Sequence, residues 1–170
     1  VLEAMRLHGV KKIIFACSNV VYGEARIFPT SEDYGPLLPI SMYGASKLAG
    51  EQAIQAACQR HLIFRTSWVY GARGANFLLT MRRLMRERPE LKIVADQIGA
   101  PTWSRMLAEA TALILSQQFS PARGGDRPEP WGVYHMTNGG ETSWHGFAEA
   151  IQEIAGAEEI SLREKNTFQN

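Results

Sequence analysis

Three polar side chains early in the sequence could move a proton to or from a sugar or alcohol oxygen. Tyr43 and Lys47 lie four residues apart in the segment YGASKLAGE, and Ser18 lies twenty-five residues before Tyr43. On a helix, residues four apart stand one above the other, so the Lys47 ammonium can reach the phenol or a ligand beside it. A nearby cation favours the phenolate, which suits a general acid or base. Tyr43, Lys47 and Ser18 are therefore the candidate catalytic residues.

Each of these residues also has an ordinary structural interpretation. Tyr43 could be a core aromatic, Lys47 a solvated helix residue and Ser18 a cap at the end of a strand. The position of Ser18 is more informative, because it follows an apolar run predicted as a strand. Ligands of open parallel sheets bind beyond the carboxyl ends of the strands.

The pattern along the chain predicts an α/β fold with a parallel sheet, because strand-like and helix-like segments alternate. The segments predicted as strands are residues 11–17, 62–67, 91–95 and 133–137. The segments predicted as helices are residues 1–9, 42–59, 76–87, 105–118 and 143–155. A long loop with three prolines, residues 22–41, and a Pro, Gly and Arg cluster at 120–130 interrupt this alternation. Long loops inside compact domains often serve a function.

Composition excludes several classes of partner. The chain has 170 residues, 45% of them hydrophobic, and a net charge of +1, so we expect neither nucleic acid nor an acidic membrane as a partner. Its two cysteines, Cys17 and Cys58, are interpreted as buried thiols of a reducing compartment, which predicts a cytoplasmic location. The four histidines lack the spacing of metal ligands, so no metal site is expected.

Arginines raise two further questions. Arg65 lies in an apolar strand and needs a buried partner, for which Asp96 is a candidate. A second group crowds one predicted helix, and we interpret it as a solvated face, with contact to a diphosphate as the alternative. This group consists of Arg82, Arg83, Arg86 and Arg88.

Longer strings resemble known enzyme families. The runs IIFACSNVVYG and PISMYGASKLAGEQ resemble the extended short-chain dehydrogenase/reductases that act on nucleotide sugars. From Leu62 onward, LIFRTSWVYGARGANFLLTMRRLMRE, DQIGAPTW and GVYHMTNGGETSWHGFAEAI resemble the dTDP-4-dehydrorhamnose reductase family. In that family a hydride from NADPH or NADH goes to the C4 ketone of a dTDP-linked deoxysugar and gives dTDP-rhamnose. The resemblance thus implies a nucleotide-sugar substrate, and it leaves open a homodimer and the choice between the two cofactors.

The resemblance also implies a domain organisation. The fold would be the C-terminal part of a Rossmann-like doubly wound parallel sheet together with a small α/β substrate-binding subdomain. Residues 1–70 would be the latter part of the dinucleotide-binding domain, and residues 71–131 mostly the substrate-binding subdomain. Residues 132–138 would form a strand that returns to the Rossmann sheet, and residues 139–170 a substrate-side helix and tail.

Roles for the candidate catalytic residues follow from the same resemblance. Tyr43 would protonate the developing C4 alkoxide. Lys47 would hold the nicotinamide ribose and tune Tyr43, so both residues would also contact the cofactor. Ser18 would bind a substrate oxygen, and Ala16 matches a position whose backbone lies along the nicotinamide, where the side chain must be small.

The substrate side would include Asn19, next to Ser18, and Trp68, which matches a position where an indole packs against the sugar. The alternative for Trp68 is a core residue at the end of a strand. Asn19 departs from the reductase pattern, because reductases have an aspartate in this segment and SNVVYG is closer to the sugar-nucleotide 4-epimerases. An NAD-dependent 4-epimerase or dehydratase is therefore an alternative function. A non-catalytic NADP-binding regulatory subunit, such as that of methionine adenosyltransferase, is another.

The glycine-rich turn that binds the cofactor in these families has no convincing counterpart in the sequence. A partial match to this turn is formed by Gly71 and Gly74, with Asp96 at about the distance of the group that binds the ribose. The match lacks a third glycine, so we interpret it as a decoy. The chain also opens with Val1 inside a helical pattern. We therefore interpret the sequence as a fragment without its cofactor-binding N-terminal half. We expect these 170 residues alone neither to bind NADPH usefully nor to turn over.

Overall fold

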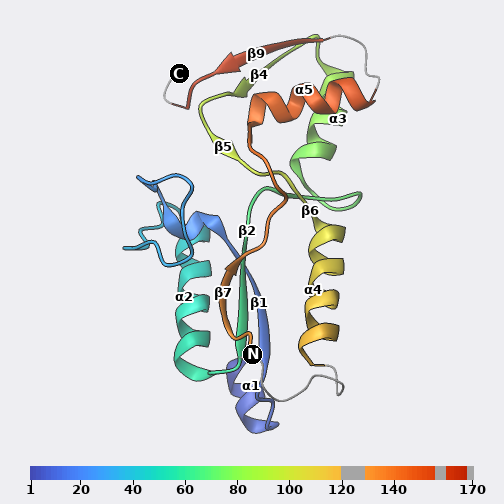
Figure 1. The fold of residues 1–170 in the computed structure, drawn as a ribbon. Helices are drawn as coiled ribbons and strands as arrows, with labels where there is room; N and C mark the ends of the chain where they lie inside the picture. Colours follow the sequence, from blue (N-terminus) through green and yellow to red (C-terminus); the bar gives the residue numbers. More distant parts are fainter. Residues whose placement is uncertain (120–128, 156–159, 168–170) are drawn as a thin grey trace. The chain divides into compact units, whose positions relative to one another are not determined.

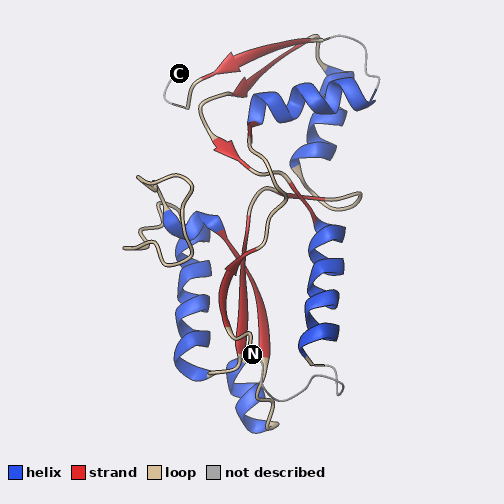
Figure 2. Cartoon of the chain, viewed as in Figure 1, coloured by secondary structure: helices blue, strands red, loops and turns tan. Residues whose placement is uncertain are grey.

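The computed structural model describes residues 1–119, 129–155 and 160–167. The chain divides into two compact units, each built from two segments (Figure 1). Unit 1 consists of Val1–Ser67 and Thr111–Met136, and unit 2 consists of Trp68–Ala110 and Thr137–Asn170. The mixed α/β architecture confirms the predicted fold class, and Figure 2 shows its helices and strands.

Unit 1 contains a three-stranded parallel sheet in the order β1-β2-β7. Its strands are β1 (Ile13–Ser18), β2 (His61–Thr66) and β7 (Gly132–His135). The register pairs Ser18 with Thr66 and Arg65 with His135, so the three strands end at the same edge of the sheet. The central strand β2 is almost entirely buried, including Arg65 and Thr66 after its apolar run Leu62–Phe64.

Helices accompany this sheet. They are α1 (Leu2–Leu7), the short 3₁₀ helix η1 (Asn19–Tyr22) and α2 (Met42–Ala57). The helix α2 begins where the Ser41 hydroxyl accepts the Gly44 N–H, which satisfies one of its free backbone donors. Ile54 of α2 packs with Cys17 and Ile63 in the core of unit 1. The helix that carries Tyr43 and Lys47 is therefore fixed against the sheet by its apolar face.

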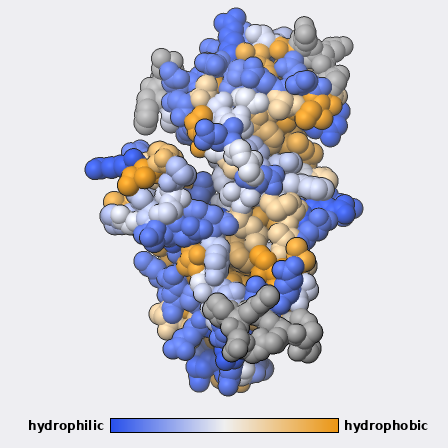
Figure 3. Space-filling view, viewed as in Figure 1, coloured by the Kyte–Doolittle hydropathy of each residue, from blue (hydrophilic) through white to orange (hydrophobic). Residues whose placement is uncertain are grey.

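The loop between η1 and α2 places apolar side chains on the surface (Figure 3). Phe28 and Ile40 are the most exposed of them, at 79% and 78%. Glu32 of this loop bonds to residues of β2 and β7, as described below.

Unit 2 combines three two-stranded ladders with helices. Its strands pair β3 (Val69–Tyr70) with β6 (Thr102–Trp103), β4 (Glu90–Val94) with β9 (Ser161–Lys165), and β5 (Ile98–Gly99) with β8 (Thr142–Ser143). Its helices are α3 (Phe77–Glu87) and α5 (Trp144–Ala155), and α4 (Ser104–Gln118) begins in unit 2 and ends in unit 1. The core contains Met81, Met85, Leu91, Ile93, Phe147, Ala148 and Ile151.

No helix in the described part of the chain is long and apolar enough to cross a membrane. The predicted loop at 120–130 lies mostly outside the described residues. The predicted allocation of domains to cofactor and substrate stays a prediction.

Candidate active site

The carboxyl end of β1 places two of the predicted site residues. Ser18 is buried, and its hydroxyl accepts the Val20 N–H at 3.4 Å, where it caps η1. The Asn19 side-chain amide donates to the Ser67 hydroxyl at 3.3 Å, directly after the end of β2. Polar side chains thus gather where two parallel strands end, which is where such sheets bind their ligands.

Lys47 links α2 to this strand. Its ammonium donates to the Ala16 carbonyl oxygen at 3.0 Å and lies 5.2 Å from the Phe15 ring centroid. The same ammonium lies 5.7 Å from the centroid of the Tyr43 ring, as the spacing of four residues predicts. An ammonium has three N–H donors, and this one uses a single donor on the protein in the described part of the chain. The remaining donors can bind a ligand.

Tyr43 is not a core residue. Its side chain is 57% exposed, which excludes the interpretation as a core aromatic. Among the described residues, none forms a hydrogen bond with its hydroxyl. Ala16, whose carbonyl accepts the Lys47 ammonium, is also exposed. The Lys47 ammonium thus lies near both the exposed Tyr43 phenol and the exposed residue Ala16 of β1.

A buried ion pair below this surface corrects one prediction. Arg65 pairs with Glu51 of α2, with 3.1 Å between Nε and Oε2, and both side chains are at most 4% exposed. Asp96, the predicted partner, instead accepts the Thr167 backbone N–H at 2.8 Å in unit 2. Glu51 is the only acidic residue of α2 and lies three residues before the buried Ile54, so its place on the apolar face of the helix could have identified it.

The same arginine connects to the long loop and to β7. It donates to the Tyr22 hydroxyl at 2.6 Å and to the Glu32 carbonyl at 2.8 Å. The Tyr22 hydroxyl also lies 2.6 Å from Nε2 of His135, whose backbone N–H donates to the Glu32 carboxylate at 3.0 Å. Burial lowers the pKa of His135, and the bond from the His135 backbone lowers the pKa of Glu32. Sequence reasoning missed this network because its members are far apart in the chain.

The two cysteines differ from each other. Cys17 is buried, as predicted, whereas Cys58 is only half-buried because it lies at the end of α2. Burial raises the pKa of the Cys17 thiol to about 11, so it stays protonated and is a poor nucleophile. Neither cysteine forms a disulfide.

Trp68 lies in unit 2, at its boundary with unit 1 in the sequence. Its half-buried indole stacks on Trp144, with 3.6 Å between the ring centroids. Its predicted role in binding the substrate stays a prediction, and this stacking limits which part of the indole a ligand can reach.

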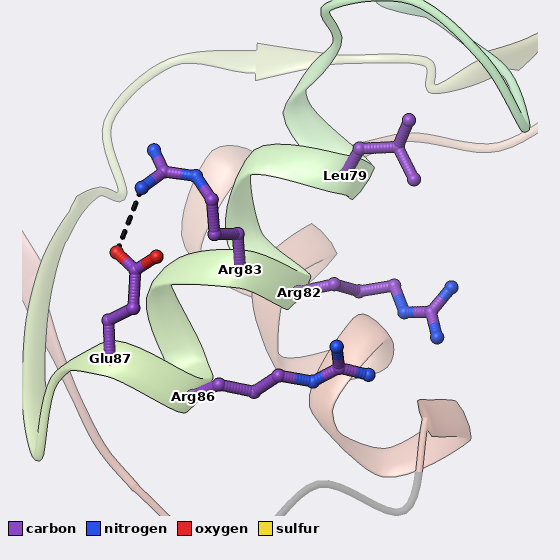
Figure 4. A pocket seen from close by; sticks show the side chains of 5 residues that line it. All are labelled: Leu79, Arg82, Arg83, Arg86 and Glu87. Atoms are coloured by element: carbon purple, nitrogen blue, oxygen red, sulfur yellow. Dashed lines mark hydrogen bonds and ion pairs between the residues drawn. The ribbon is translucent and has the colours of Figure 1, made fainter.

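The arginines of α3 form an exposed face, as predicted (Figure 4). Arg83 pairs with Glu87 at 2.8 Å, whereas Arg82 and Arg86 extend side by side away from the helix. Together with Leu79 these four residues line a shallow surface pocket.

The turn with Gly71 and Gly74 serves the start of α3. The Asn76 side chain accepts the Leu79 N–H at 3.1 Å and donates to the Gly71 carbonyl at 3.0 Å. Gly74 has a φ of +78°, which glycine adopts without strain. The turn is thus a helix cap, which agrees with its interpretation as a decoy.

Comparisons with known proteins agree with this architecture. A dTDP-4-dehydrorhamnose reductase of Burkholderia thailandensis is 54% identical over 116 residues, which cover 68% of this chain and 38% of that protein. The crystal structure of a dTDP-4-dehydrorhamnose reductase from Bacillus anthracis in complex with NADP aligns with a TM-score of 0.82 and 36% identity. That alignment covers 98% of this chain and 54% of the other. The chain therefore spans about half the length of these proteins or less.

A UDP-glucuronic acid 4-epimerase from Bacillus cereus in complex with NAD aligns with a TM-score of 0.75 over 97% of this chain and 53% of the other. At 23% identity, this similarity shows a shared fold only. The family model for the RmlD substrate binding domain matches residues 3–169. This match covers nearly all of the sequence, and the chain belongs to the RmlD substrate binding domain family.

Proposed function

We propose that the full-length protein reduces the C4 ketone of dTDP-4-dehydrorhamnose to give dTDP-rhamnose, with NADPH or NADH as the reductant. The observation that carries this proposal is the exposed Tyr43 phenol, with no protein partner among the described residues, beside a Lys47 ammonium held on the Ala16 carbonyl. The identity of the proposed substrate comes from the relatives that are named dTDP-4-dehydrorhamnose reductase.

In this reaction Tyr43 donates its proton to the oxygen at C4 as negative charge develops there. Lys47 stabilises the phenolate that remains, because its ammonium lies next to the ring. Ser18 and Asn19, at the end of β1, orient the substrate by hydrogen bonds to its oxygens. Because the protein already holds these side chains in place, little free energy is needed to orient them as the reaction proceeds.

Two features of this site fit a nicotinamide cofactor. Ala16 is exposed and small, so a flat ring can approach the strand backbone there. Lys47 has N–H donors without a partner among the described residues, and these suit the hydroxyl groups of a ribose. When bound, the cofactor supplies the hydride. Ala16, Tyr43 and Lys47 are accordingly the proposed cofactor contacts, and Trp68 is a further proposed substrate contact.

One observation favours a second function. Asn19 takes the place of the aspartate of the reductases, and its segment is closer to the 4-epimerases. A nucleotide-sugar 4-epimerase would use Ser18, Tyr43 and Lys47 for oxidation and then re-reduction, with NAD retained between the two steps. A regulatory subunit without catalysis has less support, since all three catalytic residues are present.

The test is an assay of the purified full-length protein with NADPH or NADH. We expect oxidation of the cofactor to depend on added dTDP-4-dehydrorhamnose and to yield dTDP-rhamnose. If the protein instead retains NAD through purification and interconverts UDP-sugars without net oxidation, the epimerase function replaces this one. The cytoplasmic location, a homodimer and the inactivity of the 170-residue chain alone stay predictions.

A further inference from the structure

The first turn of α2, which carries Tyr43, lies directly against η1. A Cβ at Gly44 would lie 3.0 Å from the Val20 carbonyl oxygen of η1 and 2.9 Å from Cβ of Pro39. Only glycine permits so close an approach, so the backbone next to Tyr43 must follow any movement of η1. The start of η1 is capped by the Ser18 hydroxyl. The position of η1 therefore sets where Ser18 and Tyr43 lie relative to each other.

The last residue of η1, Tyr22, fixes this short helix to the sheet. Tyr22 is 5% exposed, and its hydroxyl accepts an N–H of Arg65 at 2.6 Å. Arg65 is also bonded to Glu51 of α2. One guanidinium thus joins the end of η1 to the helix that carries Tyr43. Together with the close approach at Gly44, this bond closes a ring of contacts through η1, β2 and α2, and neither helix can shift alone.

The proton of the Tyr22 hydroxyl has two acceptors within reach. Nε2 of His135 lies at 2.6 Å and the Ser31 carbonyl oxygen at 3.2 Å. Arg65 can only donate, so the hydroxyl gives its own proton to one of these two atoms. If Nε2 carried a proton, the hydroxyl would accept two short N–H bonds and keep only the longer contact for its proton. The shorter contact therefore assigns to His135 the neutral ring, with its proton on Nδ1.

Three titratable or charged groups among the described residues face the His135 ring. Burial lowers the pKa of His135 below 6.5, Glu32 of the loop favours the charged ring, and Arg65 of the neighbouring strand disfavours it. The distance between Glu32 Oε1 and Nδ1 is 3.8 Å, which is too long for a hydrogen bond. The third group is the Tyr22 hydroxyl, whose pKa burial raises, so it stays neutral. His135 is therefore neutral near pH 7 and becomes charged in acid.

We propose that Tyr22 and His135 are positioning residues: neutral His135 accepts the Tyr22 hydroxyl proton, and this bond holds η1 so that Ser18 and Tyr43 keep their relative positions. The inference rests on the proposed function. When His135 is protonated, Nε2 can no longer accept, and the hydroxyl turns its proton to the Ser31 carbonyl. The end of η1 then loses its bond to β7. Both residues act through η1 and the first turn of α2.

Tyr22→Phe removes the hydroxyl and keeps the ring. In the full-length protein at about pH 8, where histidine is neutral, we expect kcat to fall about 10-fold, because proton transfer depends steeply on the placement of its partners. The KM for NADPH should change little, since the bond between Lys47 and Ala16 remains. Tyr34→Phe is the matched control, because its hydroxyl accepts the Arg26 N–H of the same loop at 3.1 Å. A Tyr22→Phe enzyme with the wild-type kcat would overturn the proposal.

The pH profile of kcat distinguishes positioning from a purely structural role. The wild-type kcat should fall as pH drops from 6.5 toward the lowered pKa of His135. Glu32 titrates below this range, because its pKa is lowered from 4.5. In His135→Gln the amide oxygen can accept the Tyr22 proton at every pH, so the acidic limb of the profile should disappear. The proposal is wrong if the wild type lacks this limb or if His135→Gln retains it.

A measurement without turnover separates this inference from the reductase function. The ring-nitrogen NMR signals of His135, assigned by their absence in His135→Gln, report where the ring carries its proton. We expect a neutral ring with the proton on Nδ1 in the wild type, and a mixture with the Nε2 form in Tyr22→Phe. A wild-type ring with its proton on Nε2 at neutral pH would contradict the proposal whatever the reaction.

The same profiles can be recorded for the interconversion of UDP-sugars if no dTDP-sugar is reduced. If that reaction shows the acidic limb and His135→Gln removes it, the reductase function fails and the positioning by Tyr22 and His135 stands. If neither reaction shows the limb, the positioning is wrong.

Discussion

Two segments of the helix α2 place polar side chains in opposite environments. Tyr43, in the first turn, is 57% exposed, and its hydroxyl has no partner among the described residues. Glu51, two turns later, is 1% exposed and bonded to Arg65. A buried charged group needs a fixed partner, because an unpaired buried charge destabilises the folded protein. Exposure leaves the group available for a ligand, so one helix can hold the fold together and carry the proposed chemistry.

The largest expected effect is on catalysis, from Tyr43→Phe. Loss of the general acid should lower kcat by about 10²- to 10⁴-fold. The melting temperature should not change, because the hydroxyl makes no bond to the described protein. Stopped-flow oxidation of NADPH and a thermal melt of the full-length protein measure the two quantities.

Tyr134→Phe is the matched control for this substitution. Tyr134 is also exposed, at 40%, and its hydroxyl donates to the Pro130 carbonyl at 3.0 Å. Its removal should leave kcat at the wild-type value. A Tyr43→Phe enzyme that retained activity would show that another group supplies the proton.

The second effect is on stability, from Glu51→Gln. The substitution keeps the shape of the side chain but leaves the Arg65 guanidinium buried without a counter-charge. We expect the free energy of unfolding to fall by about 3–5 kcal/mol, as is typical when one partner of a buried pair is removed. Urea denaturation followed by circular dichroism measures it. A loss below about 1 kcal/mol, the range of exposed pairs, would remove the contrast between the two segments of α2.

Sequence patterns predicted the elements of the fold better than the polar contacts between them. The alternation of apolar runs located β2 and α2, and the spacing of Tyr43 and Lys47 predicted their proximity. Periodicity describes which face of an element is apolar, whereas the partner of a buried charge depends on how elements pack. For this reason Asp96 was the wrong partner for Arg65, and the stacking of Trp68 on Trp144 was not foreseen.

A third, smaller effect depends on pH and acts through His135. Burial lowers its pKa below the ordinary value of 6.5, so the unfolded chain binds the proton more tightly than the folded protein. The free energy of unfolding should therefore fall as pH drops from 6.5 toward the lowered pKa. The pKa of Glu32 is lowered from 4.5, so its stabilising contribution is lost only at more acidic pH.

His135→Gln isolates this contribution. Urea denaturation of the variant between pH 5 and 8, roughly the range in which histidine titrates, should show a smaller slope than the wild type. His8→Gln is the control, because His8 is exposed on the surface of unit 1. Equal slopes for the wild type and the His135 variant would mean that the histidine does not contribute to the pH dependence.

The smallest expected effect comes from Glu87→Gln in the exposed pair with Arg83. Both side chains are at least half exposed, so water screens the charges and the pair costs side-chain entropy to form. We expect the free energy of unfolding to change by about 0.5 kcal/mol or less. The same urea denaturation serves for this variant and for Glu51→Gln, so the two carboxylates are compared directly. If both cost the same, burial does not determine what an ion pair contributes in this protein.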